Sequence, residues 1–335
     1  MDYAAIARDG EWFAHRYDPE HDAVHFVRMT RDIHRAATFL TDQYLPTGLE
    51  RIVLPRQAIV DATQPTPPAH FIFHSAFCCS TLLARAFDLP GISMGLKEPT
   101  IYNDIVGWRH RRGGPPARVA QVLSQATDLL ARPFASRDTA IIKPSNLANG
   151  MARAMLTMRK ESKAVLLHAP LETYLRSIAK KQMTGRLWVR DLLVKFLKED
   201  LIDIGFTAED YLGQTDLQVA AIGWLAQQAL FGRLVEEFPN RVQTLDSETL
   251  LSRPADTMRA LAKFYGLALS DARIVGIVEG PAFTKHSKSE LDFSVNARTA
   301  EYDAVASNHG DEIAKVIIWA EAVANSANVM TTTPV

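Results

Sequence analysis

The residue types best suited to chemistry form a short loop between an apolar run and a helical pattern. The segment reads His70-Phe71-Ile72-Phe73-His74-Ser75-Ala76-Phe77-Cys78-Cys79-Ser80-Thr81-Leu82-Leu83-Ala84-Arg85. A strand, a tight loop and a helix opening with two hydroxyl residues aim backbone N–H groups at the loop, which favours a phosphate or a sulfate. The Walker pattern GxxxxGK[ST] is absent, because Cys79 and Ser80 stand at its Gly-Lys positions. An ordinary strand-turn-helix with small packing residues is the alternative.

Further polar residues follow the later strand patterns. Lys97 and Glu98 end the second apolar run, Lys143 ends the third, and Arg176 and Ser177 lie on the helix after the fourth. Ligands of parallel α/β sheets collect at the carboxyl ends of the strands, so these side chains suit an anion and its reaction. The alternatives are a surface Lys–Glu pair, a lysine extending from a strand end, and a solvated helix face.

The loop resembles that of the sulfotransferases that use 3′-phosphoadenosine-5′-phosphosulfate (PAPS), whose pattern is [KR]-S-G-[ST]-T-x-L. Position by position, Phe77 falls on the basic residue, Cys78 on the serine, Cys79 on the glycine, and Ser80 and Thr81 on the hydroxyl pair. The resemblance implies that these five residues hold the 5′-phosphosulfate. Phe77 and Cys79 are departures with chemical consequences, because Phe77 supplies no cation and Cys79 has a Cβ atom where the backbone approaches an anion.

The second and third strand ends also resemble this family. Gly95-Leu96-Lys97-Glu98-Pro99 is similar to the K-E-x-x-x-F segment of glycosaminoglycan-type members, in which the glutamate takes the proton from the acceptor. The resemblance implies that Glu98 is the catalytic base. Ile142-Lys143-Pro144-Ser145 is similar to the E-K-[ST]-P segment, which implies that Lys143 or Lys97 replaces the cation missing at Phe77.

The fourth strand end resembles the family's R-[DN]-P segment, which precedes a helix with a serine. His168 falls at the arginine position, and Arg176-Ser177 matches the serine helix with one extra residue. The resemblance implies that Arg176 and Ser177 bind the 3′-phosphate.

A long segment, 280–298, is basic at its start, with Thr284-Lys285-His286-Ser287-Lys288. In place and charge it resembles the basic loop that folds over the nucleotide in this family, which implies that Lys285, His286 and Lys288 bind the cofactor. The alternative is a solvated loop. The basic run Trp108-Arg109-His110-Arg111-Arg112 has two interpretations: it binds an anionic acceptor, or it is a solvated part of the surface.

Alternating short apolar runs and longer helical patterns predict an α/β fold with a five-stranded parallel sheet that is covered by helices on each side. The resemblance implies that this is the three-layer α/β/α fold of P-loop NTPase and sulfotransferase type. The predicted strands of this sheet are His70–Ser75, Ile92–Lys97, Thr139–Lys143, Lys163–His168 and Arg241–Asp246. The predicted helices are 80–88, 118–132, 148–159, 172–181, 187–198, 216–238, 256–265 and 311–325.

A proline-rich connector, Gln64-Pro65-Thr66-Pro67-Pro68, predicts a domain boundary. Residues 1–68 then form an N-terminal addition that packs on the core, with strands at 23–27 and 51–54 and a helix at 31–43. Residues 69–335 form the sulfotransferase-like domain, with a helical insertion at about 185–238 and the lid-like loop at 280–298.

The composition narrows the remaining function classes. The chain has 335 residues, 47% apolar and 22% charged, with 37 basic and 38 acidic residues and a net charge of −1. It reads as a soluble, cytoplasmic protein without membrane insertion, and binding of nucleic acid by bulk charge is not expected. The two cysteines are adjacent and expected to be reduced, which excludes a cysteine-rich zinc module, so we expect no metal.

The resemblance implies transfer of a sulfuryl group from PAPS to a hydroxyl or amine of a small-molecule or glycan acceptor. Neither the acceptor nor the oligomeric state follows from these residues. Two alternatives stay open. One is a Mg-ATP-dependent kinase with a degenerate phosphate loop, for which Asp246 is the strand-end metal ligand, and the other is a non-catalytic relative that binds a nucleotide or a partner protein.

Overall fold

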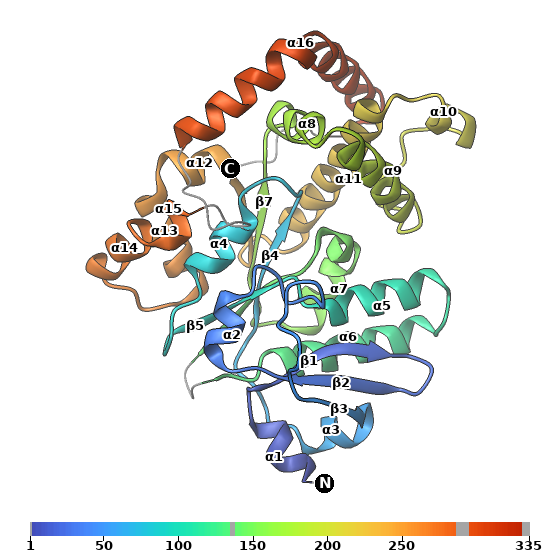
Figure 1. Cartoon of the computed structure of the whole chain (residues 1–335). Coiled ribbons are helices and arrows are strands. Elements are labelled where there is room, and N and C mark those ends of the chain that lie inside the picture. The colour runs from blue at the N-terminus through green and yellow to red at the C-terminus, as the bar shows by residue number, and fades with distance from the viewer. Residues whose placement is uncertain (1, 135–137, 286–294, 330–335) are drawn as a thin grey trace. The chain divides into compact units, whose positions relative to one another are not determined.

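The computed structural model describes residues 2–134, 138–285 and 295–329. The chain divides into two compact units, each built from separate stretches of sequence (Figure 1). The first unit comprises the described residues of Met1–Phe73, Thr81–Ala164 and Met258–Glu290. The second comprises those of His74–Ser80, Val165–Thr257 and Leu291–Val335.

A five-stranded parallel sheet flanked by helices defines the fold, which confirms the predicted α/β class. Its strands are β4 (His70–His74), β5 (Ser93–Lys97), β6 (Thr139–Lys143), β7 (Ala164–His168) and β8 (Val242–Asp246). The order is β5-β6-β4-β7-β8, and each strand lies within one residue of its predicted bounds. β4 and β5 are buried at all five positions, as expected of short apolar strands that are covered on both faces.

The N-terminal residues form a separate three-stranded antiparallel sheet with the order β1-β2-β3. Its elements are α1 (Tyr3–Arg8), β1 (Trp12–Asp18), β2 (Ala23–Arg28), α2 (Arg31–Ala36), β3 (Arg51–Pro55) and α3 (Arg56–Ala62). The two predicted strands are confirmed, and β1 adds a third. The helix predicted for 31–43 was too long, because Leu40 donates its backbone N–H to the carbonyl of Lys97 at 2.7 Å instead of continuing α2.

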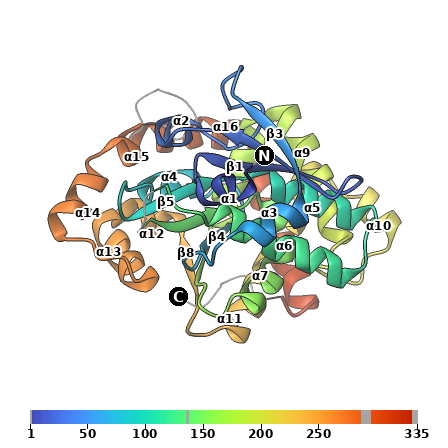
Figure 2. The ribbon, with the colours of Figure 1, turned by 90° about the horizontal axis from the view of Figure 1, so that it is seen from below.

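Two arginines join this small sheet to the helices of the same unit, α5 (Thr100–His110) and α6 (Pro116–Leu130) (Figure 2). Arg16 donates through Nε and Nη2 to the carboxylate of Asp104, with both distances 2.8 Å. Arg132 is buried just beyond α6 and donates to the carbonyls of Ile6, at 2.8 Å, and Trp12. Burial lowers the pKa of Arg132 to about 10. These contacts fix the N-terminal residues on the first unit.

Further helices lie wholly or mostly in the first unit. They are α4 (Ser80–Ala86), the 3₁₀ segment Asn146–Met151, α7 (Ala152–Met158), α13 (Pro254–Tyr265), α14 (Asp271–Val278) and α15 (Pro281–Thr284). Gly95 sets the approach of β5 to α4, because a Cβ atom at this position would lie 2.0 Å from the carbonyl oxygen of Ala84. The helix predicted for 148–159 begins as a 3₁₀ turn, and the basic run at 108–112 lies at the end of α5, which was not predicted.

The second unit adds mostly helices to β7 and β8. They are α8 (Leu171–Lys180), α9 (Gln182–Leu197), α10 (Ala208–Leu212), α11 (Asp216–Glu237), α12 (Ser247–Ser252) and α16 (Val295–Ser326). Thr215 and Gln218 form a capping box that starts α11. The indole of Trp224 is buried and donates to the carbonyl of Ala169 at 2.9 Å, so this residue belongs to the core.

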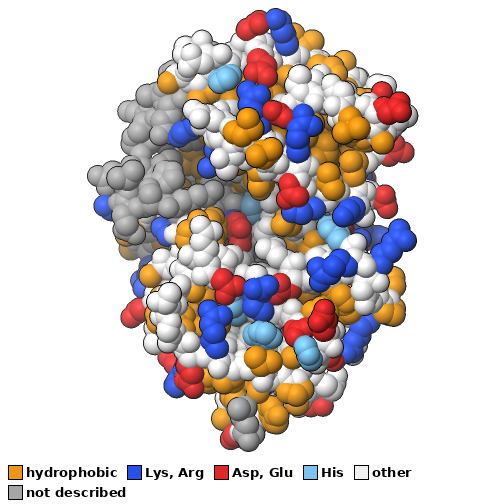
Figure 3. Space-filling view, turned by 45° about the vertical axis from the view of Figure 1, so that its right-hand side comes forward, with side chains coloured by type: hydrophobic (Ala, Val, Ile, Leu, Met, Phe, Trp, Pro, Cys, Tyr) orange, Lys and Arg blue, Asp and Glu red, His pale blue; other side chains and the backbone are white. Residues whose placement is uncertain are grey.

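Charged side chains of both signs are interspersed on the face shown in Figure 3, in keeping with the near-zero net charge. Among the helices of the described residues, none combines the length and the apolar character that crossing a membrane requires.

Candidate functional site

The predicted base and its predicted cation meet at the ends of β5 and β6. Lys143 is 1% exposed and its ammonium donates to the carboxylate of Glu98. The backbone N–H of Glu98 donates in turn to the carbonyl of Lys143 at 2.7 Å. Glu98 has a φ of +55°, a left-handed conformation that costs about 1–2 kcal/mol for a residue with a side chain. Backbone strain of this kind clusters at functional sites.

Lys97 lies opposite Lys143 in the β5–β6 register but its side chain has different partners. It is fully buried, and its ammonium donates to the carbonyls of His34 and Arg35 at 2.9 and 3.0 Å. Burial lowers its pKa to about 8, although Asp88, with an oxygen 4.0 Å away, raises it. Lys97 therefore fastens α2 to the end of β5.

Asp88 organises a buried polar cluster around Lys97. Its Oδ1 accepts from Arg31 at 2.5 Å, and its Oδ2 lies 3.7 Å from Nδ1 of His34. Arg31 also donates to Asp138 at 2.8 Å. Burial opposes the charge of Asp88, yet His34, Lys97 and Arg31 hold its pKa below the usual range. Sequence reasoning did not find this cluster, because its members come from α2, from the residues after α4 and from the residue before β6.

The loop after β4 adopts an unusual backbone. Ala76, Phe77 and Cys79 have φ values of +69°, +52° and +64°, although none of them is glycine. Successive backbone conformations of alternating hand turn N–H groups toward one side and form anion-binding concavities. At Cys79, where the family pattern has glycine, the backbone keeps the conformation that glycine favours.

Hydrogen bonds to β7 hold this loop within the second unit. The backbone N–H of Ser75 donates to the carbonyl of Leu167 at 3.0 Å, and the Cys78 thiol donates to the same oxygen at 3.3 Å. Ser75 Oγ accepts from the backbone of Ala169 at 3.4 Å. Cys78 is buried, and Cys79 is half-buried. Because of these bonds, the loop is fastened on both sides of His168, the last residue of β7.

The aromatic ring of Phe77 packs against side chains of α8 and α9. Its centroid lies 5.9 Å from that of Tyr174 and 5.4 Å from that of Trp188. The ammonium of Lys181 lies 5.9 Å from the same ring, at cation–π distance. Lys181 thus brings a cation to the position where Phe77 removes one. Sequence reasoning did not find this lysine, because no signal in the sequence links it to the loop.

Ser80 and Thr81 are the first residues of α4. They are 6% and 4% exposed, respectively. These buried hydroxyls therefore lie at the helix end that follows the left-handed loop.

Arg176 and Ser177 lie on α8. Arg176 donates to Glu172 on its own helix at 2.6 Å. The Ser177 hydroxyl contacts the carbonyl of Thr173 at 3.0 Å and the hydroxyl of Tyr302, on α16, at 2.9 Å. Their predicted contact with a 3′-phosphate stays a prediction.

His168 and Asp246 face one another at the ends of β7 and β8, with Nδ1 and Oδ2 3.8 Å apart. Burial lowers the pKa of His168, and Asp246 opposes that effect. The other carboxylate oxygen of Asp246 accepts the backbone N–H groups of Glu248, at 2.7 Å, and Thr249, at 3.3 Å, which caps α12. Both side chains therefore have structural partners in the second unit.

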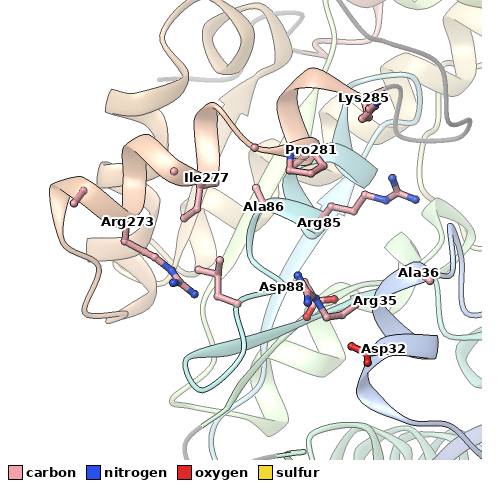
Figure 4. A pocket seen from close by; sticks show the side chains of 15 residues that line it. Asp32, Arg35, Ala36, Arg85, Ala86, Asp88, Arg273, Ile277, Pro281 and Lys285 are labelled. Carbon is pink, nitrogen blue, oxygen red and sulfur yellow. The ribbon is translucent and has the colours of Figure 1, made fainter.

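Of the predicted lid residues, Lys285 follows α15 and lines a cavity of the first unit together with Arg85 (Figure 4). His286 and Lys288 lie outside the described residues. Within the described parts of the chain, no group of three or more His, Cys, Asp and Glu side chains is arranged to hold a metal ion.

Solved structures that are similar to this chain include three sulfotransferases or sulfotransferase domains. The sulfotransferase domain from the curacin biosynthetic pathway has 11% identity and a TM-score of 0.43, over 73% of this chain and 99% of that one. The sulfotransferase domain of the Synechococcus PCC 7002 olefin synthase has 14% identity and a TM-score of 0.44, over 73% and 89%. Sulfotransferase STF9 from Mycobacterium avium has 12% identity and a TM-score of 0.42, over 73% of this chain and 77% of that one.

The chain is thus similar to sulfotransferase structures at a level too low to assign an activity. No protein-family model and no curated protein sequence matches it. Its function has to be argued from its own residues.

Proposed function

We propose that this protein is a sulfotransferase that moves the sulfuryl group of PAPS to a hydroxyl or amine of a small-molecule or glycan acceptor. The observation on which this rests is the contact between Glu98 and Lys143 at neighbouring strand ends. It pairs a carboxylate that can take a proton with a cation that can stabilise the charge of a leaving group, at the sheet edge where α/β proteins bind ligands.

In the proposed reaction Glu98 takes the proton from the acceptor oxygen or nitrogen, which attacks sulfur in line. The bond between sulfur and the phosphate oxygen breaks, and adenosine 3′,5′-bisphosphate leaves with the electron pair. Lys143, held in position by Glu98, stabilises the charge that develops on the leaving oxygen. Most of the rate gain would come from positioning and electrostatics. We assign this task to Lys143 and not to Lys97, whose ammonium is engaged by the carbonyls of α2.

The loop after β4 would hold the 5′-phosphosulfate. Its left-handed residues supply backbone N–H groups, and Ser80 and Thr81 supply hydroxyls. Lys181, packed on Phe77, would add the positive charge that the family places at that position. Arg176 and Ser177 are proposed to bind the 3′-phosphate from α8.

Two other functions remain as outcomes of the test. A kinase would require Mg²⁺ ligands, and Asp246 is already engaged with two backbone N–H groups and faces His168. A non-catalytic relative that binds a partner protein would need no base at position 98, and the backbone strain there favours a functional role for Glu98.

Calorimetry with adenosine 3′,5′-bisphosphate and with Mg-ATP tests the proposal. We expect the bisphosphate to bind without metal and in preference to Mg-ATP. A preference for Mg-ATP supports the kinase and contradicts the sulfotransferase, and the absence of binding by both supports the partner-binding protein.

Loop variants show whether the nucleotide binds where we propose. Thr81→Val removes one hydroxyl at nearly constant volume and should weaken bisphosphate binding by about 10-fold. Thr157→Val is the matched control, since Thr157 is an exposed helical threonine that bonds only its own helix. Equal affinities in both variants would exclude Thr81 from the nucleotide site.

A further inference from the structure

A cavity of about 730 Å³ lies within the first unit, lined by α2, α4, α14 and α15 (Figure 4). Its volume falls in the range of small-molecule sites, about 300–1,000 Å³. Except for Lys285, none of its lining residues belongs to the predicted sulfuryl-transfer site. The cavity is therefore a second candidate binding site.

Four basic side chains from different elements line this cavity: Arg35, Arg85, Arg273 and Lys285. Arg35 comes from α2, Arg85 from α4, Arg273 from α14, and Lys285 follows α15. Within the described part of the chain, Arg35 and Arg273 form no salt bridge. Two arginine forks from separate helices thus stay available for an anion, and a guanidinium is well suited to bidentate phosphate binding.

The acidic residues of the lining do not cancel this charge. They are Asp32 and Asp88, two against four cations. Asp88 is 6% exposed, and one of its oxygens is already bonded to Arg31, which is not part of the lining. Arg35 and Arg273, which form no salt bridge among the described residues, therefore provide two positive charges that a ligand with at least two negative charges would neutralise.

The remaining lining is mostly apolar or open, which favours a ligand with a carbon skeleton and not an inorganic ion alone. Leu89, Ile277 and Pro281 contribute apolar surface. Gly276 leaves open space, because a Cβ atom built there meets no heavy atom within 4 Å. A ligand can consequently extend along α14 between the basic side chains.

We propose that this cavity binds an organic phosphate with at least two negative charges, of the size of a sugar bisphosphate. The two unpaired arginines, Arg35 and Arg273, bind its phosphate groups from opposite helices, and the apolar lining contacts its carbon skeleton. This inference goes beyond sulfuryl transfer and does not depend on it.

Isothermal calorimetry on the full chain tests the site with glucose 1,6-bisphosphate as the probe. We expect this probe to bind, inorganic phosphate to bind at least 10-fold more weakly, and glucose not to bind. Affinity should fall as salt rises, because the contacts are between charges. No binding of glucose 1,6-bisphosphate, or equal affinity for inorganic phosphate, would overturn the proposal.

A cavity-filling variant locates the binding. Gly276→Leu places a side chain in the open space without a backbone clash and should reduce the affinity at least 10-fold. Gly310→Leu is the matched control, because Gly310 is also a helical glycine with open space but lies on α16, outside the cavity. Equal losses in both variants, or none in Gly276→Leu, would show that the probe binds elsewhere.

Charge variants test the named ligands of the phosphate. Arg35→Gln and Arg273→Gln should each weaken binding by about 10-fold, whereas Arg8→Gln, at an exposed arginine of α1, should leave it unchanged. Circular dichroism and thermal melting check that all variants are folded. Unchanged affinity in both cavity variants would rule out the arginine pair as the phosphate-binding groups.

Discussion

The ends of β5 and β6 present two buried lysines side by side, and their surroundings differ. Lys97 bonds the carbonyls of α2 and lies near Asp88, so it serves the packing of the first unit. Lys143 bonds the partly exposed carboxylate of Glu98, whose backbone is strained. Two identical residues in register thus have different partners, and these partners are the reason why we propose a role in sulfuryl transfer for Lys143 alone.

The largest expected effect concerns the cluster around Lys97. Asp88→Asn removes the buried counter-charge of Lys97 and one of the two carboxylates that Arg31 contacts, and should lower the free energy of unfolding by about 3–5 kcal/mol. Urea denaturation measures this loss. Asp32→Asn, at an exposed aspartate of α2, is the control and should change stability by less than about 0.5 kcal/mol. A similar small change in both variants would mean that the cluster does not stabilise the fold.

Glu98→Gln, beside Lys143, should mainly reduce activity, whereas Asp88→Asn mainly reduces stability. Losing the base should reduce sulfuryl transfer by about 10²–10⁴-fold, while the bisphosphate affinity stays nearly constant. Its loss of stability should be smaller than that of Asp88→Asn, because the Glu98 side chain is 23% exposed. A radiolabelled or mass-spectrometric transfer assay gives the rate. Wild-type activity would remove Glu98 from the mechanism and end the contrast between the two lysines.

The depressed pKa of Lys97 should make the free energy of unfolding depend on pH above neutrality. The folded-state pKa of Lys97 is about 8, against 10.5 for an unperturbed lysine. Between these values the unfolded chain binds more protons, so stability rises with pH. Lys97 should add up to about 3 kcal/mol to the free energy of unfolding between these pH values. The difference between wild type and Lys97→Met isolates this gain, and a difference that is constant with pH would contradict the depressed pKa.

The smallest expected effect is a change in stability from substitutions at Cys79, in the loop after β4. Cys79→Gly relieves a left-handed φ of +64° and should stabilise the fold by about 1 kcal/mol. Cys79→Ala keeps a Cβ atom and should bring no such gain. If thermal melting gives the same stability for both variants, the backbone at position 79 is not strained.

The sequence was sufficient to predict the sheet, because its strands are short apolar runs with helical patterns between them. It overextended α2, since a bond from Leu40 to β5 forms only in the folded chain. It also placed Glu98 and Lys143 at the ends of the second and third predicted strands, and the structure shows that these two strands are neighbours and that the side chains are in contact.

The partners of Lys97 could not be predicted from the sequence. These partners and their neighbours are spread along the chain, and no local pattern indicates which of them share a buried contact. They are Arg31, His34, Asp88 and Asp138. The same holds for Lys181 and Phe77, which meet only because α8 packs beside the loop. Local periodicity predicts elements, whereas the choice of long-range partners depends on packing.

Gly95 has a consequence for how substitutions along β5 would be read. It lies two residues before Lys97 and has no reactive group, yet any side chain there would collide with the backbone of α4. In a saturation library this position should reject all nineteen replacements as firmly as a reacting residue would. Mutational intolerance near this strand end would therefore mark the closeness of two backbones as well as chemistry.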